Sequence, residues 1–110
     1  MYKVVGLDGN EVINAESFCE ALKFFHEHCI RPIAQGKTFR NSETTCYIEA
    51  KEETANARMY YPYVFEFAIK AGLIKNGKLV EPLREPPVTE LIAAFSKAAI
   101  LQMTQGMGCH

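Results

Sequence analysis

Hydrophobic and polar residues alternate in two short parts of the chain, and this pattern predicts β-strands. Apolar residues on both sides of the turn sequence Asp8-Gly9-Asn10 predict a β-hairpin over residues 2–13. Residues 45–51 alternate with a period of two, which is typical of a strand with one buried face. The expected inward side chains of this strand are Cys46, Ile48 and Ala50.

Three other stretches have the spacing of helices, at about residues 15–29, 62–71 and 88–104. Asn14 is the expected N-cap of the first helix, and Pro32 is expected to stop it. The second helix, which begins at Pro62, is apolar almost all the way round, so we expect it to lie inside the domain.

The turn sequence Asn76-Gly77 stands between two short apolar runs, and it predicts a further hairpin over residues 73–80. This hairpin is a possible addition to the same sheet. Residues 55–61 carry features of both helix and strand, and the sequence leaves their structure open. The whole pattern predicts one α+β domain over residues 1–110, in which three helices cover a small antiparallel sheet.

The last predicted helix has an apolar arc of about 200° around its axis, which is wider than one helix needs against a small core. Either this helix lies under other elements of the domain, or part of its surface contacts another chain. We predict self-association, with Phe95, Ile100 and Leu101 near the contact.

Composition narrows the class of protein. Of the 110 residues, 48% are hydrophobic and 23% are charged, as in an ordinary globular domain. A net charge of −1 argues against a chain whose main task is to hold a phosphate backbone. No stretch has the length of a membrane span, and the first eight residues do not resemble a signal peptide. We expect a cytoplasmic protein whose four cysteines are thiols.

The first place to look for reactive chemistry is the segment from Cys19 to Cys29, which includes His26 and His28. His26 and His28 point to different sides of a helix, and Cys29 already belongs to its apolar stripe. Cys19 lies about two turns from His26, which is too far for a nucleophile and its base. A metal site completed by Cys109-His110, or a thiol enzyme, remains a minor alternative, and we expect no metal and no cofactor.

A second alternative is a nucleic-acid-binding regulator. Residues 62–80 have the outline of a winged-helix end, in which a helix is followed by a two-stranded wing. Lys75 and Lys78 lie in that wing, and a further basic cluster consists of Arg31, Lys37 and Arg40. The expected helix is too apolar to contact base edges, so this interpretation is the weaker one.

The most unusual composition is the run from Met59 to Tyr63. Tyrosine and methionine are enriched in the buried centres of protein interfaces. Met59, Tyr60, Tyr61 and Tyr63 are therefore the candidate partner-binding residues. The same side chains also fit an ordinary core. The leading hypothesis is a non-catalytic interaction protein (an adaptor, regulator or inhibitor) that contacts another protein.

Overall fold

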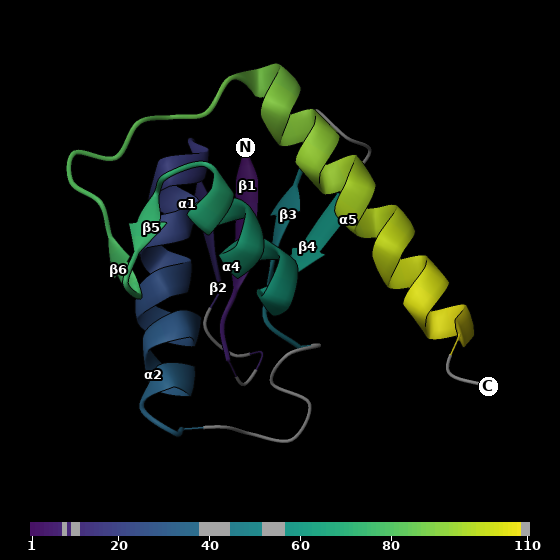
Figure 1. Cartoon of the computed structure of the whole chain (residues 1–110), viewed down its shortest axis with the longest axis horizontal. Coiled ribbons are helices and arrows are strands. Elements are labelled where there is room, and N and C mark those ends of the chain that lie inside the picture. The colour runs from purple at the N-terminus through teal and green to yellow at the C-terminus, as the bar shows by residue number, and fades with distance from the viewer. Residues whose placement is uncertain (8, 10–11, 38–44, 52–56, 109–110) are drawn as a thin grey trace.

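A four-stranded antiparallel sheet and the helices on one of its faces form the main body of the protein (Figure 1). The structure is a computed structural model that describes residues 1–7, 9, 12–37, 45–51 and 57–108, with side chains as far as residue 102. The strands are β1 (Tyr2–Val5), β2 (Val12–Ala15), β3 (Tyr47–Ala50) and β4 (Ala57–Tyr60). Their order in the sheet is β2-β1-β3-β4. The predicted α+β class is confirmed.

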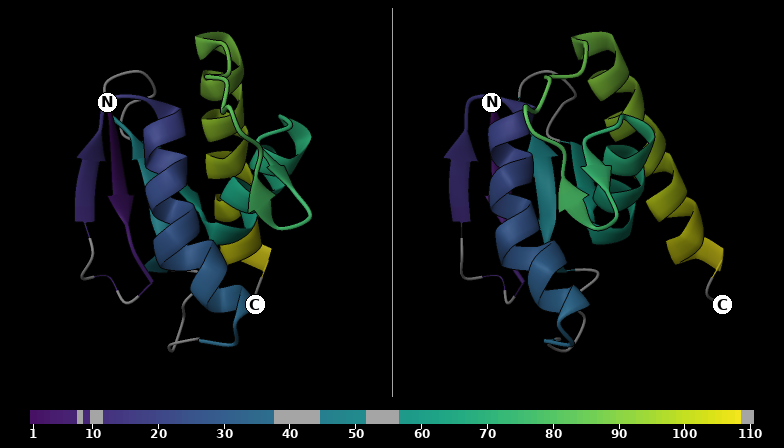
Figure 2. Two further views of the ribbon diagram at one scale, coloured as in Figure 1. Left: turned by 90° about the vertical axis from the view of Figure 1, so that its left-hand side faces the viewer. Right: turned by 60° about the vertical axis from the view of Figure 1, so that its left-hand side comes forward.

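Alternation along the strands separates the two faces of the sheet. The ring of Tyr2 in β1 contacts the rings of Phe18 and Phe95, at centroid distances of 5.9 and 6.1 Å, so this face carries the helices. Both views in Figure 2 show the helices on the same side of the sheet. On the opposite face, Tyr47 and Tyr60 are cross-strand partners whose ring centroids lie 5.3 Å apart.

The predicted strand at 45–51 is confirmed at its centre as β3, and its three inward side chains are all buried. The hairpin predicted over 2–13 forms from β1 and β2, although β2 continues to Ala15. Residues 57–60, left open by the sequence, form β4.

The first helix, α1 (Phe18–Phe25), begins later than predicted. Its N-cap is Ser17, whose hydroxyl accepts the backbone N–H of Glu20 at 3.2 Å. Asn14, the expected cap, lies within β2 opposite Lys3. The prediction was wrong because the sheet register extends over the residues that would have formed the first turn.

Helical structure also continues past the predicted stop. A π-helical turn, η1 (His26–Ile30), follows α1 and leads directly into α2 (Arg31–Ala34). The backbone N–H of Arg31 bonds to the carbonyl of His26, five residues back. This wider turn lets Pro32 occupy the first turn of α2, where a missing N–H costs little.

Helix α4 (Tyr61–Lys70) begins one residue before the prediction and lies on the surface, not inside the domain. Only Val64 and Ala68 are fully buried, and Ile69 is 50% exposed. The near-continuous apolar sequence was misleading because several of its rings are only half-buried.

The hairpin predicted over 73–80 forms from β5 (Ile74–Lys75) and β6 (Lys78–Leu79), but it is a separate two-stranded sheet. Asn76 and Gly77 have φ angles of 54° and 78°, the left-handed values that this turn requires.

The last helix, α5 (Val88–Gly108), runs past β4, the strand at one end of the sheet (Figure 1). Leu91, Phe95 and Ala98 are buried against the core. One continuous core joins this helix to the sheet, α1 and α4.

Candidate functional site

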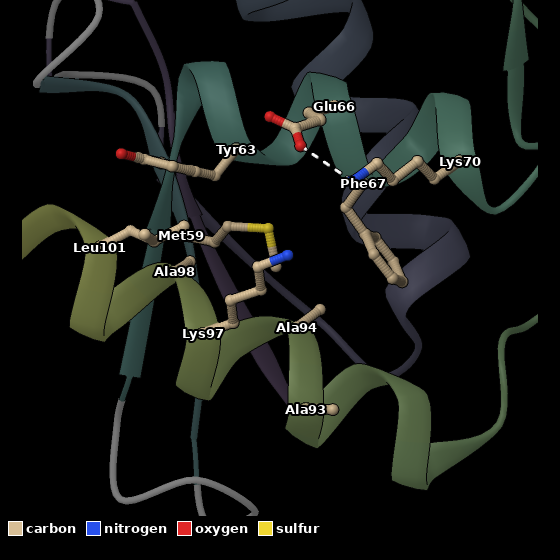
Figure 3. Close-up of a pocket in the computed structure, with 10 residues that line it drawn as sticks. All are labelled: Met59, Tyr63, Glu66, Phe67, Lys70, Ala93, Ala94, Lys97, Ala98 and Leu101. Atoms are coloured by element: carbon tan, nitrogen blue, oxygen red, sulfur yellow. Dashed lines mark ion pairs between the residues drawn. The ribbon is translucent and has the colours of Figure 1, made fainter.

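A groove of about 200 Å³ runs between α4 and α5, with Met59 of β4 at its floor (Figure 3). It is lined by Met59, Tyr63, Glu66, Phe67, Lys70, Ala93, Ala94, Lys97, Ala98 and Leu101. Most of the lining is apolar, and its charged residues, Glu66, Lys70 and Lys97, are exposed to solvent. Such an arrangement favours binding of apolar groups with a few polar contacts at the edge.

Helical spacing places both walls. On α4 the lining residues from Tyr63 to Lys70 are separated by three, one and three positions, so they share one side of the helix. On α5 the lining residues from Ala93 to Leu101 follow a similar spacing. Three of the five lining positions on α5 are alanines, and their short side chains leave the space that forms the groove.

Charge is unevenly distributed at the opening. The Lys70 ammonium lies 3.1 Å from a carboxylate oxygen of Glu66, and this pair is exposed to solvent. The Lys97 side chain extends from α5 into the groove (Figure 3). Among the described residues no carboxylate pairs with Lys97. The opening therefore presents a net positive charge to a ligand.

The tyrosine and methionine run predicted to bind a partner does not form one surface. Met59 is 1% exposed and belongs to the core, so a partner cannot contact more than its groove edge. Tyr60 lies on the open face of the sheet beside Tyr47. Tyr61 packs beside Phe25 and Phe65 at the start of α4.

Tyr63 is the one tyrosine of this run that lines the groove. Its hydroxyl is buried and has no hydrogen-bond partner among the described residues. The run was misleading because consecutive residues pass from a strand into a helix, and their side chains diverge.

The predicted self-association residues also separate. Phe95 is fully buried in the core and cannot contact a second chain, which corrects that part of the prediction. Ile100 is 63% exposed and Leu101 is 38% exposed. Leu101 lines the groove, and Ile100 lies farther round α5 on its solvent side.

The candidate basic residues lie on two elements. Lys75 and Lys78 are exposed cross-strand neighbours in the β5–β6 hairpin, and Arg31 and Lys37 are exposed at α2 and just beyond it. Arg40 lies outside the described residues. The helix before the hairpin, α4, exposes a single basic residue, Lys70, which is paired with Glu66, so it offers little basic surface for a duplex.

The described residues contain no cluster of three or more side chains that could hold a metal. The ring of His26 bonds to the carbonyl of Gly77 at 2.8 Å, and His28 stacks on Phe24. Cys29 is buried, and its thiol faces the carbonyl of Val5. Cys109 and His110 lie outside the described residues.

Cys19 does not have the surroundings of an activated nucleophile. Burial, a hydrogen bond from its thiol to Glu85 and the negative charge of Glu85 raise the pKa of Cys19 to about 11. Near neutral pH the group is therefore a thiol and not a thiolate.

Two structural side chains were missed by the sequence analysis. Glu85 accepts the backbone N–H groups of Phe18 and Cys19 at the start of α1. Gln102 forms two hydrogen bonds with the backbone of β4. No local pattern predicts either contact, because the partners are 67 and 42 residues apart.

Comparison with known proteins finds no matching family model, and no curated protein or solved structure matches the chain significantly. Within the described part of the chain, no helix combines the length and the hydropathy that crossing a bilayer would need.

Proposed function

We propose that this protein is a non-catalytic interaction domain that binds a partner protein in the groove between α4 and α5. The observation that carries the proposal is the groove itself, because it joins an apolar floor to a positively charged opening. Grooves of this kind between helices commonly accept the apolar face of an amphipathic helix.

The shape and charge of the groove indicate the chemistry of its partner. Its α5 wall extends from Ala93 to Leu101, or about 12 Å at the rise of an α-helix, which corresponds to two or three turns of a bound helix. Because Lys97 has no carboxylate partner among the described residues, a carboxylate on the bound helix would complement it. The expected partner segment is an amphipathic helix with acidic residues beside its apolar face.

The cytoplasmic setting expected from the sequence is part of this proposal. In that compartment Cys19, Cys29 and Cys46 would stay reduced. Whether the partner makes the protein an adaptor, a regulator or an inhibitor depends on the partner's own activity.

Affinity purification from the native cell tests the proposal when three forms of the tagged protein are compared. Leu101→Asp places a charge in the apolar groove, and Lys97→Glu reverses the charge at its opening. Ser96→Asp is the matched control, because Ser96 is an exposed residue of the same helix that does not line the groove.

We expect a specific partner to be retained by wild type and the control, and to be lost or reduced at least about tenfold in both groove variants. Circular dichroism must show that all forms are folded. If every protein captured by wild type is captured equally by both groove variants, the groove is not the binding site.

A further inference from the structure

The outer edge of β4 is closed by a side chain that takes the place of a neighbouring strand. Among the strands that the structure describes, β4 stands at the end of the sheet and pairs with β3 alone. The backbone N–H of Tyr60 donates to Oε1 of Gln102 at 3.0 Å, and Nε2 of Gln102 donates to the carbonyl of Arg58 at 3.1 Å. Along an edge strand, the N–H and C=O groups of every second residue point away from the neighbouring strand. The Tyr60 N–H and the Arg58 carbonyl are two of these outward groups, and a fifth strand would bond to them.

Gln102 belongs to the last part of α5 whose side chains are described, where few side chains are buried. The last fully buried side chain of the helix, among those described, is that of Ala98. Beyond it, Ile100 is mostly exposed and Leu101 is partly exposed. Segments with few buried apolar contacts open locally at low free-energy cost. The end of α5 is therefore the part of the molecule best suited to uncover the β4 edge.

We propose that the β4 edge is a second interaction surface, that its occupant is β4 of a second copy of the chain, and that Gln102 blocks this pairing. Exposed strand edges are templates for pairing with another chain, and proteins commonly cover them. This inference concerns the backbone edge of β4 and not the binding of a partner in the groove, although Met59 and Leu101 belong to both regions. It does not depend on the groove having a partner.

The chemistry of β4 fits pairing with itself. An antiparallel pair of β4 strands centred on Met59 places Arg58 of each copy opposite Tyr60 of the other. These two residues would exchange both backbone hydrogen bonds. One of the two, from the Tyr60 N–H to the Arg58 carbonyl, would use the groups that Gln102 now satisfies. Cross-strand arginine and tyrosine are compatible neighbours, and the Arg58 guanidinium already stacks on the Tyr47 ring at 4.6 Å from its centroid.

The test compares Gln102→Ala with wild type and with Gln35→Ala, which changes an exposed glutamine just after α2. Hydrogen exchange measures the opening of the edge, and sedimentation equilibrium measures association. We expect Gln102→Ala to speed exchange of the Tyr60 amide by about tenfold in dilute solution and to strengthen dimerisation by a similar factor. Gln35→Ala should resemble wild type. Gln102→Glu retains an acceptor for the Tyr60 N–H but lacks the donor to the Arg58 carbonyl, so its exchange rate and dimerisation should lie between those of wild type and Gln102→Ala. It replaces Gln102→Ala in the test if that variant does not fold.

A second change identifies the edge used by the dimer. Tyr60 has a φ angle of −80°, which proline can adopt, and its N–H points away from β3. Adding Tyr60→Pro to Gln102→Ala should remove the gained association, whereas adding Tyr60→Ala, which keeps the N–H, should preserve most of it. The proposal is wrong if Gln102→Ala leaves exchange or association unchanged, or if the Tyr60→Pro form associates as strongly as Gln102→Ala alone.

Discussion

The carboxylate of Glu85 accepts the backbone N–H of Phe18 at 2.8 Å, across a separation of 67 residues. Its second oxygen accepts the N–H of Cys19 at 2.9 Å, so one side chain satisfies two of the unpaired donors at the start of α1. The negative charge also lies at the positive end of the helix dipole. This contact links the segment before α5 to the start of α1. It therefore helps to position α5, which forms one wall of the groove.

Replacing Glu85 with glutamine should abolish one of the two hydrogen bonds, because an amide NH2 group cannot accept a backbone N–H, and should weaken the other by removing its charge. We expect the free energy of unfolding to fall by about 1–2 kcal/mol, as measured by urea denaturation. Glu81→Gln is the matched control, because Glu81 influences Cys19 through its charge but has no hydrogen bond to α1. Equal losses in the two variants would show that charge alone explains the effect of Glu85.

The raised pKa of Cys19 predicts a pH dependence of stability. The ordinary pKa of a cysteine is about 9.0, and in the folded protein the pKa of Cys19 is raised to about 11. The folded state therefore holds this proton more tightly than the unfolded state. The stabilising contribution is present in full below about pH 9 and is lost as the pH rises toward 11.

Urea midpoints measured from pH 8 to 11 check this prediction. The wild type should lose more stability over that range than Cys19→Ser, in which the other titrating groups are the same. Slow reaction of Cys19 with iodoacetamide at pH 7 should accompany it, because little thiolate is present. A parallel pH dependence in both proteins would contradict the assigned pKa.

Truncation of Phe95 and of Ile100 should change the free energy of unfolding by very different amounts, although both residues were predicted to lie near an interface. Phe95→Ala should lower the free energy of unfolding by about 3–5 kcal/mol, because it leaves a cavity beside Tyr2 and Phe18. Ile100→Ala should change it by no more than about 0.5 kcal/mol. Thermal or urea unfolding of the two variants distinguishes a core residue from a surface residue.

Self-association through Ile100 and Leu101 stays a prediction. Weak dimerisation of wild type in sedimentation equilibrium should be reduced by Ile100→Asp, which places a charge on the exposed side of α5. If Ile100→Asp leaves the association constant unchanged, the exposed apolar side of α5 is not the contact.

Arg58 is expected to matter for stability through Glu49. The guanidinium lies 2.8 Å from a carboxylate oxygen of Glu49, which is largely buried on the open face of the sheet. Arg58→Ala should cost about 1.5–3 kcal/mol in unfolding free energy, because it removes the charged hydrogen bond of that carboxylate. The double variant Arg58→Ala with Glu49→Gln should recover part of the loss, and no recovery would argue against this pair.

Local patterns predicted the strands and helices well where one physical signal dominated. Asn76-Gly77 produced the expected turn, and alternation at Cys46, Ile48 and Ala50 identified a buried strand face. Long-range contacts decided the cases that failed. Asn14 was a sound N-cap by type, but strand pairing with Lys3 placed it in the sheet.

The groove could not be predicted from the sequence because its walls come from separate helices. Lys97 and Leu101 face Tyr63 and Phe67 only after both helices pack over β4. The sequence did identify Tyr63 and Leu101 as contact residues, but it grouped them with Met59 and Phe95, which the fold buries. Apolar character alone does not distinguish a core position from a binding surface.

Photo-crosslinking inside native cells tests the groove most directly. A benzophenone amino acid at position 93 would lie at the groove, and one at position 96 would lie on the same helix outside it. We predict a discrete crosslinked partner from position 93, which disappears when Leu101→Asp is added, and none from position 96. A partner that crosslinks equally from both positions, or from position 96 alone, would contradict the proposed site.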